Sequence, residues 1–379
     1  MKRQLVKRIM EKRYTQSQYA ELIKEEAEKV ESYNILLLTH SEATVRDTKS
    51  EPGDSGSKLL QDIAKSVGVT VYMADFVGLE IDKTSTGHTL KAFTFDKNAA
   101  VQLPDSKGKV EYQKPIKINP ANTIIMPRGI GTLGFTGSRN WYDMMEMLEL
   151  EGYFVLNSMK CFDLCNSKYM SYLKFLHHKV RTPKTVAITH SETVEESFKK
   201  LKTDFPIILK SSTGTQTGVG VVVVESLRSL KALVQMTLLY NKYLPIIIQE
   251  YIKTDWDIRV LVCEGEVVAA MKRIVMNDDV RSNASMGADT ETLELTELEK
   301  SESIRIAEEF GGRLVGVDLI PAKDREKELP YCIEINANPG LSGIEEITKG
   351  SPTKAILEIY KNRSVWPAST PNNESADNE

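Results

Sequence analysis

The stretch IEINANPG, residues 333–340, decides how the fold of this chain is interpreted. Side chains alternate between the two faces of a β-strand, so Glu334 and Asn336 share one face while the flanking isoleucines point into the core. Asp318 lies in the preceding strand candidate, VGVDLI. Two carboxylates and an amide oxygen on neighbouring strands suit Mg²⁺, which keeps several waters and also binds nucleotide phosphates. The alternative is a buried carboxylate satisfied by backbone amides, but three converging oxygen ligands favour the metal site.

A glycine-rich loop upstream provides a second element of the same chemistry. The strand candidate PIILK ends at Lys210 and is followed by SSTGTQTGVGV, residues 211–221. Glycines such as Gly214 let backbone amides approach phosphate oxygens closely, and the lysine adds a point charge. The loop is neither a P-loop nor a dinucleotide-binding fingerprint, because its glycines follow the lysine and no GK[ST] occurs. Most such loops are hairpin turns, so this one indicates phosphate binding only together with the metal site.

The stretch IIIQEYIKTDWDIRV, residues 246–260, is the third element. Its apolar strand leads to four residues whose backbone could read an adenine edge: Gln249, Glu250, Tyr251 and Ile252. Asp257 is a candidate for a ribose hydroxyl, and Arg259 for a transferring phosphoryl group. Taken alone, Asp257 and Arg259 would be interpreted as a surface ion pair. The polar segment 281–283 would likewise be interpreted as a solvated loop.

Composition limits the class of protein. The 379 residues are enough for two or three domains, with 41% hydrophobic and 27% charged residues. Lys and Arg number 49 against 53 Asp and Glu, so a general nucleic-acid binder is not expected. No apolar run approaches the roughly 18 residues that span a bilayer, and the N-terminus is charged where a signal peptide is apolar. Four cysteines are too few for a disulfide scaffold, so we expect reduced thiols and a cytoplasmic protein.

Four segments are expected along the chain. They are an N-terminal helical arm at 1–33, an α/β domain at 34–157, a longer unit at 158–362 and a disordered tail at 363–379. The first domain should contain buried parallel strands at 34–39, 69–73 and 123–127, with helices at 57–67 and 140–150. Residues 45–57 are expected to form a mobile loop, and 82–120 an extra hairpin with a long connection.

The longer unit is predicted to alternate helices with short strands. A single helix is expected at 160–178, and a helix at 193–202 should begin with a capping box of Thr193 and Glu196. Further strands are expected at 206–210 and 221–224, with a helix at 227–240. Glu264–Gly265 indicates a hairpin, and Gly311–Gly312 a helix C-terminus. Two final strands carry Asp318 and Glu334.

Together these motifs resemble the ATP-grasp superfamily, most closely the RimK-type ligases, which add glutamate to the C-terminus of a ribosomal protein. The resemblance covers about residues 123–350 and follows the order Lys168, Lys210 with its loop, QEYI, DIR, VVAAMKR, RSN, GVDL and EINANPGLSGIE. It implies a pre-ATP-grasp α/β domain followed by a two-subdomain ATP-grasp fold of α+β character. The lid-bearing subdomain would cover 158–240 and the metal-binding subdomain 241–362.

The resemblance also implies roles for individual residues. Lys168 and Lys210 correspond to the phosphate-contacting lysines, and Asp257 to the ribose contact. The RSN segment corresponds to groups that reach the γ-phosphate and the acyl phosphate; it consists of Arg281, Ser282 and Asn283. Two Mg²⁺ ions, replaceable by Mn²⁺, would be bound by Asp318, Glu334 and Asn336. The segment between QEYI and DIR is about two residues shorter than the family pattern, which weakens the ribose assignment.

The implied activity is an ATP-dependent carboxylate–amine ligase that works through an acyl phosphate, with Arg259 and Arg281 stabilising the tetrahedral intermediate. Its expected substrates are ATP, an amino acid (glutamate favoured) and a peptide or protein C-terminus; a homo-oligomer is also implied. Three alternatives stay open: a small-molecule or dipeptide ligase, a non-catalytic nucleotide-binding module, and a kinase. Arg128 is a candidate for acceptor recognition or for a structural role, and the tail ending in Glu379 is a weaker candidate for self-modification.

Overall fold

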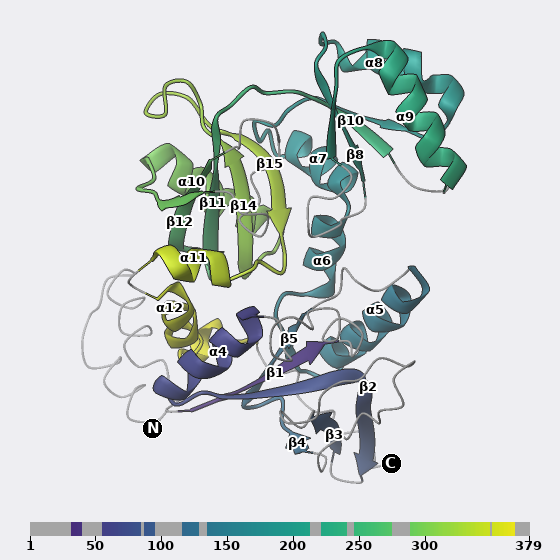
Figure 1. Cartoon of the computed structure of the whole chain (residues 1–379). Coiled ribbons are helices and arrows are strands. Elements are labelled where there is room, and N and C mark those ends of the chain that lie inside the picture. Colours follow the sequence, from purple (N-terminus) through teal and green to yellow (C-terminus); the bar gives the residue numbers. More distant parts are fainter. Residues whose placement is uncertain are drawn as a thin grey trace, which may run out of the picture.

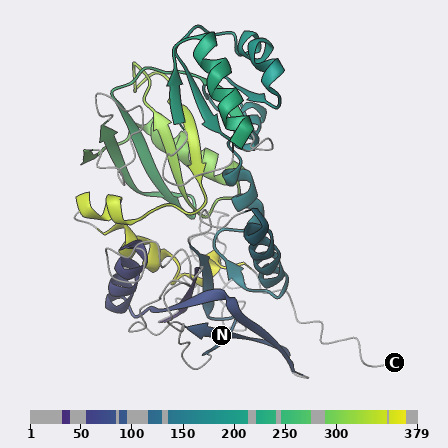
Figure 2. The same cartoon turned by 45° about the vertical axis from the view of Figure 1, so that its right-hand side comes forward.

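The computed structural model describes residues 32–39, 55–84, 87–94, 116–128, 135–212, 221–240, 246–274, 289–348 and 351–367. The predicted N-terminal arm, apart from residues 32–33, and most of the predicted loop at 45–57 lie outside these residues. The loop prediction is wrong for 55–57, where a helix begins at Ser55. The tail prediction is wrong at its start, because Arg363–Val365 form a 3₁₀ turn and Trp366 donates to the carbonyl of Tyr360; the tail beyond 367 lies outside the described residues. The described strands form three sheets. In both views the four-stranded sheet lies at one end of the molecule, the five-stranded sheet in the middle and the six-stranded sheet at the other end (Figure 1, Figure 2).

The six-stranded sheet has the order β4-β3-β2-β1-β5-β6. Its parallel centre consists of β1 (Asn34–Thr39), β2 (Thr70–Thr84), β5 (Thr123–Pro127) and β6 (Phe154–Val155). β3 (Gly87–Thr94) and β4 (Ile116–Ile118) add antiparallel strands at the edge. The helices of this part are α4 (Ser55–Ser66) and α5 (Phe135–Leu150). The α/β prediction is confirmed, because the apolar runs of β1 and β5 are buried strands. Within the expected hairpin region 82–120, β3 and β4 pair antiparallel, whereas β2 runs on to Thr84, well past the strand expected at 69–73.

The four-stranded sheet is antiparallel and has the order β7-β10-β8-β9. Its strands are β7 (Thr185–Ile188), β8 (Ile207–Ser211), β9 (Val221–Val224) and β10 (Ile246–Glu250). Helices α8 (Val194–Leu201) and α9 (Leu227–Tyr240) bury one apolar face against it. The capping box predicted at Thr193 is wrong: a short 3₁₀ turn precedes α8, and the Thr193 hydroxyl donates to the carbonyl of His190 at 2.8 Å.

The five-stranded sheet has the order β13-β12-β11-β14-β15. Its strands are β11 (Trp256–Cys263), β12 (Glu266–Ile274), β13 (Thr290–Thr292), β14 (Leu314–Ile320) and β15 (Tyr331–Asn336). The predicted hairpin joins β11 to β12, where Glu264 and Gly265 have φ of 48° and 80°. Helix α10 (Glu297–Glu309) packs on one face and ends before Gly311, whose φ is 64°. Its N-terminus carries a capping box of Thr296 and Glu299 that the sequence analysis missed.

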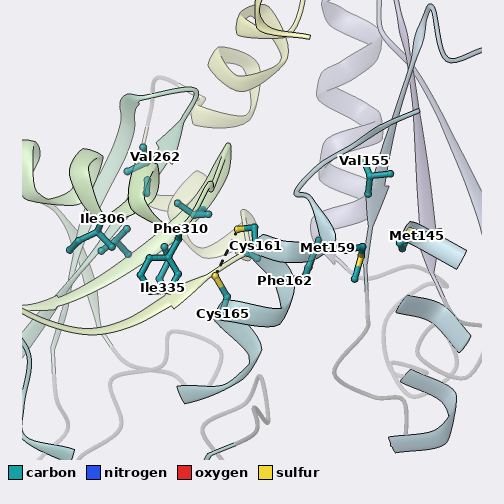
Figure 3. Close-up of a cluster of buried hydrophobic side chains, with 14 of the residues drawn as sticks. Met145, Val155, Met159, Cys161, Phe162, Cys165, Val262, Ile306, Phe310 and Ile335 are labelled. Carbon is teal, nitrogen blue, oxygen red and sulfur yellow. Dashed lines mark hydrogen bonds between the residues drawn. The ribbon is translucent and has the colours of Figure 1, made fainter. Parts of the chain in front are cut away.

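Two short helices stand where one was predicted. α6 (Met159–Asn166) and α7 (Lys168–His177) are separated at Ser167, whose backbone is extended. The Ser167 hydroxyl accepts a hydrogen bond from the backbone of Met170, and the Lys168 N–H donates to the carbonyl of Ser212 at 2.7 Å. A side-chain cap and a tertiary bond therefore replace the intrahelical bonds that a continuous helix would form. α6 buries Cys161 and Cys165 against Phe310 and the five-stranded sheet (Figure 3).

The C-terminal helices connect the five-stranded sheet to the first part of the chain. α11 (Ser342–Ile347) and α12 (Pro352–Ile359) share a core with β1, α4, the C-terminal end of β11 and the N-terminal end of β14. The face of the five-stranded sheet that these helices cover is apolar at this end. At the opposite end, the same face carries charged residues. Buried Asn157 strengthens the junction: its side-chain amide donates to the carbonyls of Leu314 and Ala337, and its oxygen accepts from two backbone N–H groups.

Candidate active site

The three predicted metal ligands lie on the two last strands of the five-stranded sheet. β14 and β15 are antiparallel, and Asp318 lies directly opposite Glu334 in their register. Asn336 lies two residues further along β15, on the same face. A register shift follows Asp318, so that Leu319 pairs with Cys332 and the strand bends at the carboxylates. Side chains directly opposite on antiparallel strands have Cβ atoms about 4.5–5.5 Å apart, close enough for two carboxylates to share a cation.

Asp318 is held by two arginines from neighbouring strands. Arg259 on β11 bonds both of its oxygens, through Nε and through Nη2, the latter at 2.8 Å. Nη2 of Arg273 on β12 lies 3.3 Å from Oδ2 of Asp318. Burial disfavours the charged form, but the two guanidinium groups outweigh it, so the pKa of Asp318 lies below its ordinary value. The carboxylate is therefore ionised at neutral pH, as a metal ligand must be.

Asp257 forms a buried ion pair where a ribose contact was implied. Nε and Nη2 of Arg273 donate to its two oxygens at 2.6 and 2.8 Å, and both residues are buried. Both oxygens of Asp257 are thus engaged by Arg273, as those of Asp318 are by Arg259, and Asp257 orients Arg273 beside Asp318. The ribose role of Asp257 stays a prediction.

Glu334 is paired with a cation from outside the sheet. Nζ of Lys168, the first residue of α7, lies 3.0 Å from Oε1 of Glu334. Burial disfavours ionisation of Glu334, but the Lys168 ammonium outweighs it and the pKa of Glu334 lies below its ordinary value. The two metal-site carboxylates are thus both ionised and both paired with cations of the chain.

Lys210 approaches this site from the four-stranded sheet. Its ammonium donates to Oε1 of Gln249 on the adjacent strand at 2.8 Å, and Nε2 of Gln249 donates to the Thr185 hydroxyl at 2.7 Å. The Thr185 hydroxyl donates in turn to the carbonyl of Pro183. Each hydrogen bond in this series can run in only one direction, because the ammonium only donates and the carbonyl of Pro183 only accepts. The amide of Gln249 is therefore fixed with its oxygen toward Lys210. Burial, assisted by the nearby charge of Lys168, lowers the pKa of Lys210 to about 8.

Three of the predicted residues follow Gln249 directly in the chain. Glu250 ends β10; its carboxylate accepts from the backbone of Lys184 at 3.2 Å and lies 3.8 Å from that residue's ammonium. Tyr251 and Ile252 follow in the half-buried connection to β11. The predictions for Gly214, Arg281, Ser282 and Asn283 lie outside the described residues.

Arg128 forms structural contacts, and its role in acceptor recognition stays a prediction. It follows β5, is buried, and donates from Nη1 to the side chain of Asn338 at 2.5 Å and to the carbonyl of Pro339 at 3.1 Å. It therefore fixes the loop after β15 to the six-stranded sheet and keeps the end of the metal-site strand in place.

The side-chain roles of two site residues escaped the sequence analysis. Gln249 was considered only for its backbone at an adenine edge, and not as a side-chain partner of Lys210. Arg273 ends VVAAMKR, which was treated as a family pattern without a role. The alternation of β12 against β11 was a usable signal, since the hairpin at Glu264–Gly265 brings the charged ends of the two strands together.

The donor set fits Mg²⁺. Asp318, Glu334 and Asn336 supply two carboxylates and an amide oxygen, the hard ligands that Mg²⁺ prefers. Among the described residues no three His, Cys, Asp or Glu side chains gather as a metal site, and the predicted set combines two carboxylates with the amide oxygen of Asn336.

The four-stranded sheet supplies Lys210, and the five-stranded sheet supplies the ionised carboxylates of Asp318 and Glu334. A RimK-like ATP-grasp domain matches residues 165–359, slightly more than half of the chain, so the chain belongs to the RimK-like ATP-grasp family. Among curated relatives, a probable alpha-L-glutamate ligase of Coxiella burnetii is 34% identical over 239 residues, which are 62% of this chain and 75% of the relative.

Solved structures of the same fold support the architecture. The RimK domain protein ATP-grasp of Sphaerobacter thermophilus superposes with a TM-score of 0.55 at 13% identity, over 86% of this chain and 98% of that one. The ATP-grasp ligase PsnB, complexed with minimal precursor, Mg and ADP, gives a TM-score of 0.58 at 16% identity over 87% and 98% of the two chains. The expected ATP-grasp fold is confirmed, and the protein is an ADP-forming ATP-grasp ligase. ATP and Mg²⁺ are the cofactors general to this family.

Proposed function

We propose that this ligase joins an amino acid, glutamate favoured, to the C-terminal carboxylate of a peptide or protein. Support for glutamate comes from the relatives called probable alpha-L-glutamate ligases, and support for a peptide from the structure of PsnB complexed with precursor peptide PsnA2 and AMPPNP. The observation that carries the chemistry is the register of Asp318 opposite Glu334, with Lys168 bound to the latter. A pair of ionised carboxylates facing lysines suits binding of a metal–polyphosphate complex.

The reaction would begin at an unreactive carboxylate. The acceptor carboxylate oxygen attacks the γ-phosphorus of ATP, the bond to the β-phosphate oxygen breaks, and ADP leaves an acyl phosphate. The deprotonated amine of the amino acid then attacks the carbonyl carbon, and inorganic phosphate leaves as the amide forms. Lys168 and Lys210 would stabilise phosphate charge, and Arg259 would stabilise the oxyanion of the tetrahedral intermediate.

The metal would be held by Asp318, Glu334 and Asn336. When bound, it supplies Lewis-acid neutralisation of the polyphosphate. Two ions, with Mn²⁺ as a substitute, are our proposal for this set.

The roles of Arg281, Ser282 and Asn283 at the γ-phosphate, of Gly214 in the phosphate loop, and of Glu250, Tyr251 and Ile252 at the adenine stay part of the same proposal. So do the domain limits, the homo-oligomer and the cytoplasmic location. None of the described helices is both long and apolar enough to cross a membrane.

The test is a screen for ADP release with each of the twenty amino acids, with and without peptides that end in glutamate. We expect release that requires both an amino acid and a peptide, with glutamate giving the highest rate. Mass spectrometry of the products should show a peptide lengthened by the amino acid. Products made without peptide would instead establish a small-molecule ligase, and a phosphorylated product without an amide would establish a kinase.

The variant Glu334→Gln tests the metal role directly. It keeps the shape of the side chain, removes one ionised metal ligand, and should abolish ADP release while circular dichroism is unchanged. Full activity in this variant would contradict the metal role. An absence of ADP release across the whole panel, with nucleotide binding intact, would instead favour a non-catalytic nucleotide-binding module.

A further inference from the structure

Lys168 joins the two antiparallel sheets at the candidate site. It is the first residue of α7, and its backbone N–H donates to Ser212 of the four-stranded sheet at 2.7 Å. Its ammonium reaches the other way, to Oε1 of Glu334 at 3.0 Å on the five-stranded sheet. The Lys168 side chain is 15% exposed and that of Glu334 is 33% exposed. The contact is thus a partly buried ion pair that occupies a predicted metal ligand.

The charges of the described cluster oppose binding of a bare divalent cation. Four cationic side chains face three carboxylates; the cations are Lys168, Lys210, Arg259 and Arg273, and the carboxylates are Asp257, Asp318 and Glu334. Partly buried charges at such distances interact much more strongly than charges in water. A metal that entered alone would have to displace the Lys168 ammonium into solvent and would meet a site without net negative charge.

A bound nucleotide would change this balance. Polyphosphate oxygens offer the ammonium a new partner, and a lysine can swing on its flexible four-carbon stem while the bond from its N–H to Ser212 is kept. Ser212 directly precedes the glycine-rich loop, so the root of Lys168 is anchored beside the segment predicted to bind phosphate. Asp318 keeps Arg273 as a partner even when Arg259 is drawn away.

We propose that Lys168 is a resident counter-ion for Glu334 that transfers to the nucleotide phosphates, so that a divalent metal binds tightly only together with nucleotide. The inference rests on the proposed function in taking Glu334 as a metal ligand. Its consequence is a positive coupling between metal and nucleotide, which by linkage must act equally in both directions. Couplings of this kind typically change an affinity by about 5–150-fold.

The experiment measures free Mn²⁺ by electron paramagnetic resonance in titrations of the full-length protein, with and without ADP. For the unaltered protein we expect ADP to tighten Mn²⁺ binding at least about fivefold. Lys168→Met should tighten Mn²⁺ binding without ADP, on the order of tenfold, because Glu334 loses its competitor. The same variant should weaken ADP binding and reduce the coupling. A merely structural role for Lys168 would weaken Mn²⁺ binding in both conditions.

Three further variants keep the test decisive. Lys160→Met removes one exposed lysine from α6 and should leave Mn²⁺ binding unchanged. Lys168→Gln keeps a hydrogen-bond donor near Glu334 without the charge and serves if the methionine variant folds poorly. Lys168→Met combined with Glu334→Gln should lose the gained Mn²⁺ affinity, which locates the ion.

Unchanged or weaker nucleotide-free Mn²⁺ binding in both single Lys168 variants would overturn the proposal. Because no turnover is measured, this result is distinct from a failure of the proposed ligation. Coupling between metal and nucleotide binding without amide formation would contradict only the proposed function. Amide formation without that coupling would contradict only this inference.

Discussion

Oε1 of Gln249 accepts a hydrogen bond of 2.8 Å from the ammonium of Lys210. The two residues lie on adjacent antiparallel strands, and the other end of the amide is fixed by Thr185. Gln249 is buried and its side-chain amide has a single orientation, so it holds the Lys210 ammonium in one position. The finding makes Gln249 a positioning residue for the cation that we assign to the phosphates.

Replacing Gln249 by leucine should therefore weaken phosphate recognition. A hydrogen bond to a charged group contributes about 1.5–3 kcal/mol, so we expect ADP binding to weaken about tenfold or more. AMP has fewer phosphates for Lys210 to contact, and its affinity should change much less. Calorimetric titration of both nucleotides gives the ratio, and Gln235→Leu on the exposed face of α9 is the control. Equal losses for ADP and AMP would indicate a general structural defect.

The ADP affinity should also depend on pH through Lys210. Burial and the charge of Lys168 lower its pKa from 10.5 to about 8 in the free protein. Below that pH the ammonium is charged and binds phosphate, whereas above it a proton must be taken up on binding. ADP affinity should thus be constant toward neutral pH and fall as the pH rises through about 8. Lys210→Arg keeps the charge at higher pH and should remove this fall; a decrease that persists in the arginine variant would contradict the assignment.

The lowered pKa of Lys210 has a matching effect on stability. In the unfolded chain the lysine keeps its ordinary pKa of 10.5, so the folded protein binds its proton less tightly. The charged form costs folding free energy below about pH 8, and this cost declines as the pH rises between the two values. Urea denaturation across that range should show a smaller rise in stability for Lys210→Met than for the unaltered protein, because the methionine variant lacks the titrating group.

Arg273→Met should destabilise the fold strongly. Arg273 is buried with Asp257 and Asp318, and its loss leaves Asp257 without the guanidinium that binds both of its oxygens. Removing one partner of a buried ion pair typically costs about 3–5 kcal/mol. Urea denaturation would measure this, with Lys231→Met, which removes an exposed partner of Glu195, as a control expected to change little. Arg273→Met combined with Asp257→Leu should recover part of the loss, and a double variant less stable than both singles would contradict the ion-pair account.

The sequence predicts the strands of this fold better than the breaks between elements. β1 and β5 are continuous apolar runs, and Glu264–Gly265 is a hairpin signal that depends only on local backbone preference. The break at Ser167 depends on Lys168 bonding to Ser212, a contact between distant segments that no local pattern encodes. The capping box at Thr193 failed for a local reason, since its hydroxyl donates to the carbonyl of His190 in the preceding turn.

The candidate site shows the same division. The opposite placement of Asp318 and Glu334 follows from strand alternation and could be expected from the sequence. Which cation pairs with which carboxylate could not, because Arg273 binds Asp257 only once the β11–β12 register is set. A ribose role for Asp257 was implied by its place in the motif, whereas its burial beside Arg273 is a property of the folded sheet.

A last prediction concerns the space that Arg259 occupies. Gly316 precedes Asp318 by two residues on β14, and a Cβ added there would lie 3.1 Å from Nη1 of Arg259 and 3.2 Å from Cβ of Pro339. Gly316→Ala should therefore displace the guanidinium from Asp318 without altering any charge. Small misplacements of a catalytic group can cost about 100-fold in rate, so kcat should fall by up to that amount, with the KM for ATP changed little. Gly340→Ala adds the same methyl group where no atom lies within 4 Å, and its kinetics should match the unaltered protein. If both alanine variants turn over at the normal rate, Arg259 does not act from this position.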